Sequence, residues 1–220
     1  MGRCRPAAYD RTTRGARLYL NTPRLRGLLA VTLAAAAASA MVIVNTVVLI
    51  RAGLDLGQRE VAITLAAFGG GSMPAALALP SVLDRLADRT VMLAAAIMPT
   101  IVLAGFALSW PLSDRPGYWY GLLAGWTLLG VAYSASGTPG GRLLKQSSSA
   151  DDRPSLFAAQ FALSHVCWLL AYPLAGQIGA RAGLGAAFAA AAGLALLGVV
   201  LAVMVWPPRD PELENIITTI

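Results

Sequence analysis

The sequence predicts an all-α membrane protein that crosses the bilayer several times. Of its 220 residues, 57% are hydrophobic and only 13% are charged, and the mean hydropathy is +0.64. Soluble domains carry about 25% charged residues, so this composition is typical of a protein that lives in lipid. The apolar runs are rich in Ala, Leu, Val and Gly and lack the strict alternation of a transmembrane barrel, which favours helices.

Six apolar runs are long enough to cross the hydrocarbon core, which takes about 20 apolar residues in a helix. They cover residues 28–50, 61–83, 91–110, 118–141, 155–180 and 184–206. We therefore expect one transmembrane domain of six helices over residues 27–206. A basic tail or linker at residues 1–26 and a short tail at residues 207–220 would flank it. The connections are short, so neighbouring helices should pack antiparallel.

The basic residues predict the orientation of the chain. With the N-terminal tail placed inside, the inner segments hold thirteen of the 17 Lys and Arg residues, and the outer loops hold only Arg51, Arg59, Arg115 and Arg181. This positive-inside bias places both termini in the cytoplasm of a plasma-membrane protein. It also explains the pI of about 9.9 without nucleic acid as a partner.

Residues 1–26 have two interpretations. Arg11, Arg14 and Arg17 recur at helical spacing beside the apolar patch Leu18–Leu20. The pattern fits a short helix on the inner membrane surface, where Arg is attracted to anionic lipid. It fits an ordinary tail that sets topology equally well.

Catalytic and metal-binding chemistry has little support in the sequence. All eleven acidic residues lie in tails, loops or at span ends, whereas a charge in the bilayer core usually marks an ion or proton path. One histidine and two cysteines, Cys4 and Cys167, form neither a metal cluster nor a catalytic triad. We expect neither an enzyme nor a cofactor.

The polar side chains that enter the membrane gather on the fifth run. At 100° per residue they span an arc of about 140°, well under half of the helix; these are Gln160, Ser164, His165, Trp168 and Tyr172. In lipid such a face should turn inward. It fits a solute-binding wall, because Trp and Tyr add stacking surface to hydrogen-bonding groups, but a polar packing seam fits it too. Asn45, next to Thr46 on the first run, is a weaker candidate for the same cavity.

Two further segments have open interpretations. Gly69, Gly70 and Gly71, followed by Pro74, predict a deformable helix that either lines a cavity or packs closely against a neighbour. The inner loop at residues 142–154 carries Ser147–Ser149, two aspartates and Pro154. That order predicts a helix N-terminus rather than a regulatory site.

The inner loop between the second and third runs crowds four charges into "DRLADR", residues 84–89. It resembles the loop signature of the major facilitator superfamily, in which Gly, three residues, Asp, a basic residue, one residue and Gly precede two basic residues. Asp84 and Arg85 match its core and Arg89 its last position, whereas Pro80, Ala87 and Asp88 depart from it. Degenerate copies of this kind are typical of the second half of such transporters.

This resemblance, together with the six runs and the basic tail, implies the C-terminal half of a twelve-helix transporter. It implies a gating loop in which Asp84 lies at the positive end of the third span and Arg85 and Arg89 pair with carboxylates or carbonyls. It also implies a solute path lined by the first, second, fourth and fifth spans. Topology-setting charges are the alternative role for the loop.

The implied function is movement of a small solute across the lipid bilayer by alternating access. Because a solute cavity in such folds lies between two halves, the chain would pair with a second six-helix half or with a copy of itself, or be a truncated product. A non-transporting assembly or regulatory module is the alternative.

Overall fold

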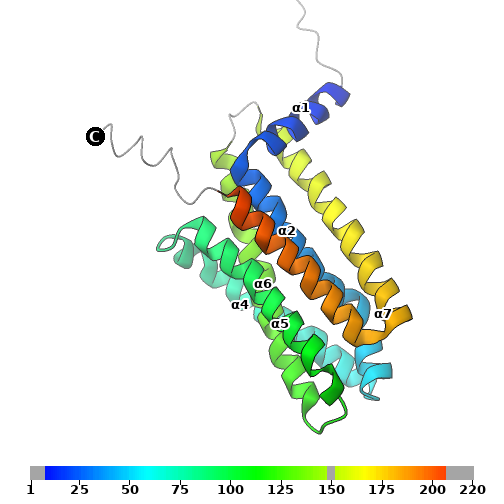
Figure 1. Cartoon of the computed structure of the whole chain (residues 1–220). Helices are drawn as coiled ribbons and strands as arrows, with labels where there is room; N and C mark the ends of the chain where they lie inside the picture. Colours follow the sequence, from blue (N-terminus) through cyan, green and yellow to red (C-terminus); the bar gives the residue numbers. More distant parts are fainter. Residues whose placement is uncertain (1–7, 148–151, 207–220) are drawn as a thin grey trace, which may run out of the picture.

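The computed structural model describes residues 8–147 and 152–206 and, for side chains, residues from 14 onward within those ranges. This part of the chain is helical and contains no strand. The elements pack as a bundle (Figure 1), with α1 at the end of the bundle where α7 begins. In chain order they are α1 (Ala8–Asn21), α2 (Pro23–Ala40), η1 (Met41–Asn45), α3 (Thr46–Val48), η2 (Leu49–Gly53), α4 (Gln58–Leu83), α5 (Asp88–Ser109), η3 (Trp110–Leu112), α6 (Tyr118–Gln146) and α7 (Arg153–Val205).

All six apolar runs fall on helices. Four continuous helical stretches in the described residues are long and apolar enough to span: Pro23–Gly53, Gln58–Leu83, Asp88–Leu112 and Arg153–Val205. Helix α6, rich in Gly, Ser and Tyr, is not among them. The last stretch contains two of the expected runs, because Gly183, with φ 84° and ψ 170°, breaks the helical backbone and reverses the chain.

Helix α2 is the centre of the bundle. Its Ala-rich sequence buries most of its surface, and the two parts of α7 pack on either side of it (Figure 1). At Gly198 an added Cβ would lie 2.6 Å from the carbonyl oxygen of Ala30. Small side chains therefore set the distance between these helices, as is usual where lipid provides no hydrophobic drive between helices.

The C-terminal half of the first apolar run departs from regular α-helix. Residues 41–45 and 49–53 form two π-helical segments around the short helix α3. Here Trp126 Nε1 donates to Thr46 Oγ1 at 3.0 Å, and Asn45 Nδ2 donates to the carbonyl of Ala175 at 3.3 Å. These bonds join the first run to α6 and to the first part of α7.

Helices α4 and α6 also meet through glycine. An added Cβ at Gly71 would lie 2.0 Å from the carbonyl oxygen of Thr127, and one at Gly130 would lie 2.0 Å from that of Phe68. Helix α4 continues without interruption through Pro74. Of the two interpretations of the Gly-rich segment, close packing is found at Gly71, whereas Gly69 and Gly70 have no neighbour within 4 Å.

The N-terminal segment forms the predicted short helix, α1, and packs against the beginning of α7. An added Cβ at Gly15 would lie 2.5 Å from the carbonyl oxygen of Ser155, and Arg14 pairs with Asp152 at 3.3 Å. The predicted helix start is confirmed at Arg153 and Pro154. The serines at 148 and 149, the aspartate at 151 and the tail at 207–220 lie outside the described residues.

The adjacent glycines of α4 provide a matched test of this packing. Gly71→Ala should lower the free energy of unfolding by about 1–3 kcal/mol, because its methyl group collides with backbone. Gly70→Ala should leave it unchanged or raise it by up to about 1 kcal/mol through helix propensity. Thermal unfolding of both variants in detergent measures this, and equal midpoints would contradict the contact.

Candidate functional site

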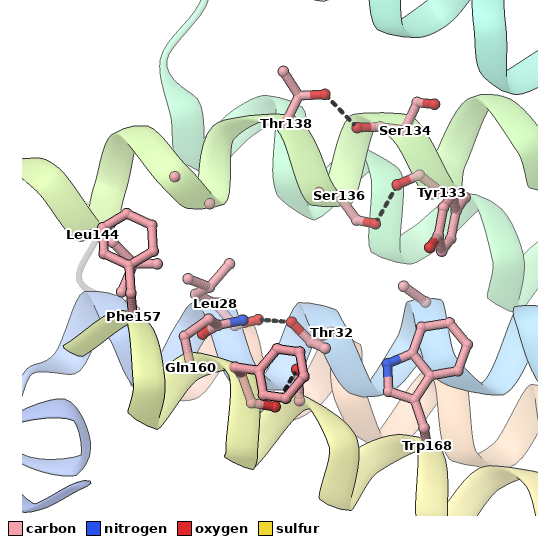
Figure 2. Close-up of a pocket in the computed structure, with 16 residues that line it drawn as sticks. Leu28, Thr32, Tyr133, Ser134, Ser136, Thr138, Leu144, Phe157, Gln160 and Trp168 are labelled. Atoms are coloured by element: carbon pink, nitrogen blue, oxygen red, sulfur yellow. Dashed lines mark hydrogen bonds between the residues drawn. The ribbon is translucent and has the colours of Figure 1, made fainter. Parts of the chain in front are cut away.

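A pocket of about 650 Å³ opens between α2, α6 and the first part of α7 (Figure 2). Helix α2 forms its floor, and α6 and α7 form its two walls. A volume of this size suits a small organic molecule. The side chains that distinguish the pocket are Thr32 on α2, Tyr133, Ser134, Ser136 and Thr138 on α6, and Phe157, Gln160, Phe161, Ser164 and Trp168 on α7.

The hydroxyl groups of the pocket serve mainly as acceptors. Each serine or threonine hydroxyl donates its proton to a backbone carbonyl at 2.7–3.0 Å. In four of these bonds the carbonyl lies on the same helix as its hydroxyl donor. The fifth bond runs from Ser134 on α6 to the carbonyl of Ser72 on α4. The oxygen of each hydroxyl keeps acceptor capacity, so the pocket offers several acceptor sites.

Aromatic rings form the end of the two walls that lies away from Leu144 and Phe157 (Figure 2). Trp168 packs edge-on against Tyr133 across the pocket, with ring centroids 6.3 Å apart. It packs in the same way against Tyr172 on its own helix, at 5.4 Å. Such contacts fix ring orientation, which gives the pocket a stacking surface of defined shape.

Three of the predicted binding residues lie together in this pocket. Gln160, Ser164 and Trp168 are spaced four residues apart and line it from α7 (Figure 2). Tyr172, one turn further, packs against Trp168 and the core and does not line it. Part of the helical arc on the fifth run therefore faces this pocket, and its last turn packs against the core.

His165 and Asn45 occupy other environments. His165 is exposed on α7, with Nδ1 2.7 Å from the carbonyl oxygen of Phe161 and its ring tilted against the Phe161 ring, with centroids 4.1 Å apart. Asn45 is 3% exposed and bonds to Ala175, with Gly179 directly against its amide. Neither lines the pocket, and Asn45 connects the first apolar run to α7.

Sequence reasoning named no residue of α6 as a site candidate, although the resemblance assigned the fourth span to the solute path. Four polar side chains fall within one six-residue segment of the fourth apolar run: Tyr133, Ser134, Ser136 and Thr138. This density of polar residues could have indicated a binding surface. Of the four spans that the resemblance assigns to the path, three line this pocket, and α4 supports it through the bond from Ser134 to Ser72.

The charged loop has a different arrangement from the expected one. Asp84 and Arg85 are exposed at the C-terminal end of α4. Asp88 occupies the first turn of α5, where the helix dipole favours a carboxylate. Its Oδ2 lies 3.6 Å from Nε of Arg142 on α6, and Nε of the neighbouring Arg89 is buried without a hydrogen-bond partner. Asp88, which departs from the signature, thus takes the position expected for Asp84.

Within the described ranges, no group of three or more His, Cys, Asp or Glu side chains could hold a metal ion. The pocket also contains no charged residue among the sixteen that line it. What the described residues offer is therefore a neutral binding surface of hydroxyl, amide and aromatic groups.

Comparison with known proteins gives one match. The family model described as Major Facilitator Superfamily matches residues 28–219, which include the pocket and the charged loop. No curated protein and no solved structure matches the chain.

The ion pair at the charged loop can be tested by a matched pair of substitutions. Asp88→Asn should lower the free energy of unfolding by about 1 kcal/mol, because it removes both the Arg142 pair and the helix-dipole interaction. Asp84→Asn should have a smaller effect, since that carboxylate is exposed. Thermal midpoints in detergent compare them, and an equal loss in both variants would refute the assignment to Asp88.

Proposed function

Because the chain belongs to the Major Facilitator Superfamily, we propose that it is a secondary active transporter that moves a small solute by alternating access. The family consists generally of membrane transporters and not of enzymes. Its members act within the lipid bilayer on small solutes, and the chain is accordingly a multi-pass membrane protein.

The observation that carries this proposal is the pocket. A cavity of about 650 Å³ lies between helices, extends from the beginning of the first and fifth apolar runs to the middle of the fifth run at Trp168, and is lined by hydroxyl, amide and aromatic groups. Binding sites of secondary transporters lie near the bilayer midplane between helical repeats. We assign Gln160, Ser164 and Trp168 to solute contact, together with the polar side chains of α6.

We propose six membrane crossings, with both termini in the cytoplasm of a plasma-membrane protein. The crossings are the stretch from α2 to η2, α4, α5, α6 and the two parts of α7 on either side of Gly183. The reversal at Gly183 and the short loops support antiparallel neighbours. The excess of Lys and Arg on one side supports the orientation.

The chain acts as one half of a larger transporter. The pocket has walls on α6 and α7 and a floor on α2 (Figure 2), and no other described helix contributes a lining residue that would close it. His165 is exposed on the same helix, and an ionisable side chain facing lipid in a span is costly. A second six-helix half, or a second copy of this chain, would cover this side and complete the pocket. This polar opening favours transport over a non-transporting assembly or regulatory role.

We assign the loop of Asp84, Arg85, Asp88 and Arg89 to the inner gate. The pair between Asp88 and Arg142 connects the start of α5 to the inner end of α6, which is the helix that forms one wall of the pocket. A change in the tilt of α6 would break this contact, so the ion pair favours one of the two access states.

The two native cysteines provide a test of orientation. Cys4 lies in the tail, whereas Cys167 is 6% exposed within α7. A membrane-impermeant maleimide should label Cys4 only after cells are permeabilised, while Cys167 stays unlabelled. An added Ser113→Cys in the opposite loop should be labelled in intact cells. Labelling of Cys4 in intact cells would refute the proposed orientation.

Transport can be measured without knowing the solute. Proteoliposomes containing the full chain are loaded with a cell extract of molecules below 1 kDa, and mass spectrometry identifies what leaves faster than from empty liposomes. Gln160→Ala or Trp168→Ala should slow the exit at least about tenfold, because each removes a polar or stacking contact of the pocket.

Met73→Ala provides the control for this experiment, since Met73 is 69% exposed on α4 and away from the pocket. Its exit rate should equal that of the unchanged chain. Exit that is unaffected by either pocket substitution would refute the proposed site, and no selective exit from the unchanged chain would refute a transporter made of two copies of this chain.

A further inference from the structure

We propose that Tyr19 is a positioning residue of the pocket: its hydroxyl fixes the amide of Gln160, and this makes the site selective for an uncharged solute that presents a hydrogen-bond acceptor. The inference rests on the proposed function and goes beyond it by naming the class of solute and a residue, outside the pocket, that determines it. Three observations support it.

The first observation is the direction of the Tyr19–Gln160 bond. Tyr19 is fully buried among the apolar side chains between α1, α2 and α7. Its hydroxyl donates to Oε1 of Gln160, which is its only hydrogen bond in the described part of the chain. A buried hydroxyl without an acceptor is costly, and burial raises the pKa of Tyr19, so it stays a donor. The Gln160 oxygen must therefore face Tyr19.

The second observation follows from the geometry of an amide. With Oε1 held by Tyr19, the Nε2 amino group points the other way and keeps two N–H donors. Gln160 lines the pocket, and Figure 2 shows its side chain reaching from α7 toward Thr32 on α2. The serine and threonine hydroxyls of the pocket donate to backbone carbonyls, so the Gln160 amino group is a donor to a solute, beside the Trp168 indole N–H and the Tyr133 hydroxyl.

The third observation is that none of the sixteen lining residues carries a charge. A charged solute would lose hydration without gaining a counter-charge from these residues, and burying an unpaired charge is far more costly than burying a hydrogen-bonded polar group. Phe157, Phe161, Tyr133 and Trp168 supply flat apolar surface. The preferred solute is therefore neutral and partly aromatic, with a carbonyl or similar oxygen at Gln160.

Tyr19 also links this site to the N-terminal segment. Helix α1 is held on α7 by three contacts in succession: the Arg14–Asp152 pair, the close approach of Gly15 to Ser155, and the Tyr19–Gln160 bond. A change in the position of α1 would free the Gln160 amide to rotate. The pocket and the N-terminal segment are therefore coupled through one hydrogen bond.

The test uses three tritiated probes with the same ring system: naphthalene-2-carboxamide, naphthalene-2-carboxylate and 2-naphthylmethylammonium. Binding to the full chain in nanodiscs is measured by equilibrium dialysis, with empty nanodiscs subtracted for partition into lipid. The neutral amide should bind at least about tenfold more tightly than either ion. Equal binding of all three probes, or no binding, would overturn the assignment of the pocket.

The role of Tyr19 is tested by a double-mutant cycle. Tyr19→Phe removes only the hydroxyl and should weaken binding of the carboxamide about fivefold, the loss expected for one hydrogen bond. In the Gln160→Leu background the same change should have no effect. Tyr120→Phe, at a tyrosine that is 69% exposed, is the matched control. Its binding and thermal midpoint should equal those of the unchanged chain.

Two outcomes would overturn the positioning role. One is a Tyr19→Phe variant with unchanged affinity. The other is an equal loss in both backgrounds, because Tyr19 would then act through the fold and not through Gln160. Selective binding of the carboxamide by a chain that moves no solute would refute the proposed transport and leave this inference standing.

Discussion

The close contact of α2 with both parts of α7 is the constraint on which the rest of the structure depends. Lipid supplies no hydrophobic drive between helices, so attraction comes from packing at short range. Ala30 and Gly198 permit that range. With α2 held in the middle, α6 and the first part of α7 are kept apart, and the space between them is the pocket. A larger residue at this interface between α2 and α7 would displace α2, which forms the floor of the pocket, and so change the shape of the pocket.

Much of the helical fold could be predicted from the sequence, because apolar length is a property of single segments. The ends of the apolar runs, the reversal near Gly183 and the helix start at Pro154 all follow from local composition. The π-helical segments could not be predicted in this way. They accommodate Asn45 and Thr46, whose partners Ala175 and Trp126 are distant in sequence.

The candidate site was only partly predictable, for a related reason. The helical arc indicates which side of the fifth run is polar, but not how much of that side lines the pocket. It therefore included His165 and Tyr172 with Gln160, Ser164 and Trp168. Which of them reach the pocket depends on where α2 and α6 lie. The Tyr19–Gln160 bond joins residues 141 positions apart, and no local pattern indicates it. Similarly, which aspartate lies at the N-terminal end of the third span depends on where α5 begins, and that residue is Asp88 instead of the expected Asp84.

The reversal at Gly183 has a mechanical consequence for the fifth helix. The arm from Arg153 to Gly183 contains about 30 residues and is therefore about 45 Å long. The chain reverses within one residue, so no loop separates the two parts of α7. A tilt of the first part about Gly183 therefore displaces its N-terminal end the most. By simple trigonometry on that length, a swing of about 5° shifts the tip by about 4 Å. The Arg14–Asp152 pair sits at that tip, where leverage on the arm is greatest.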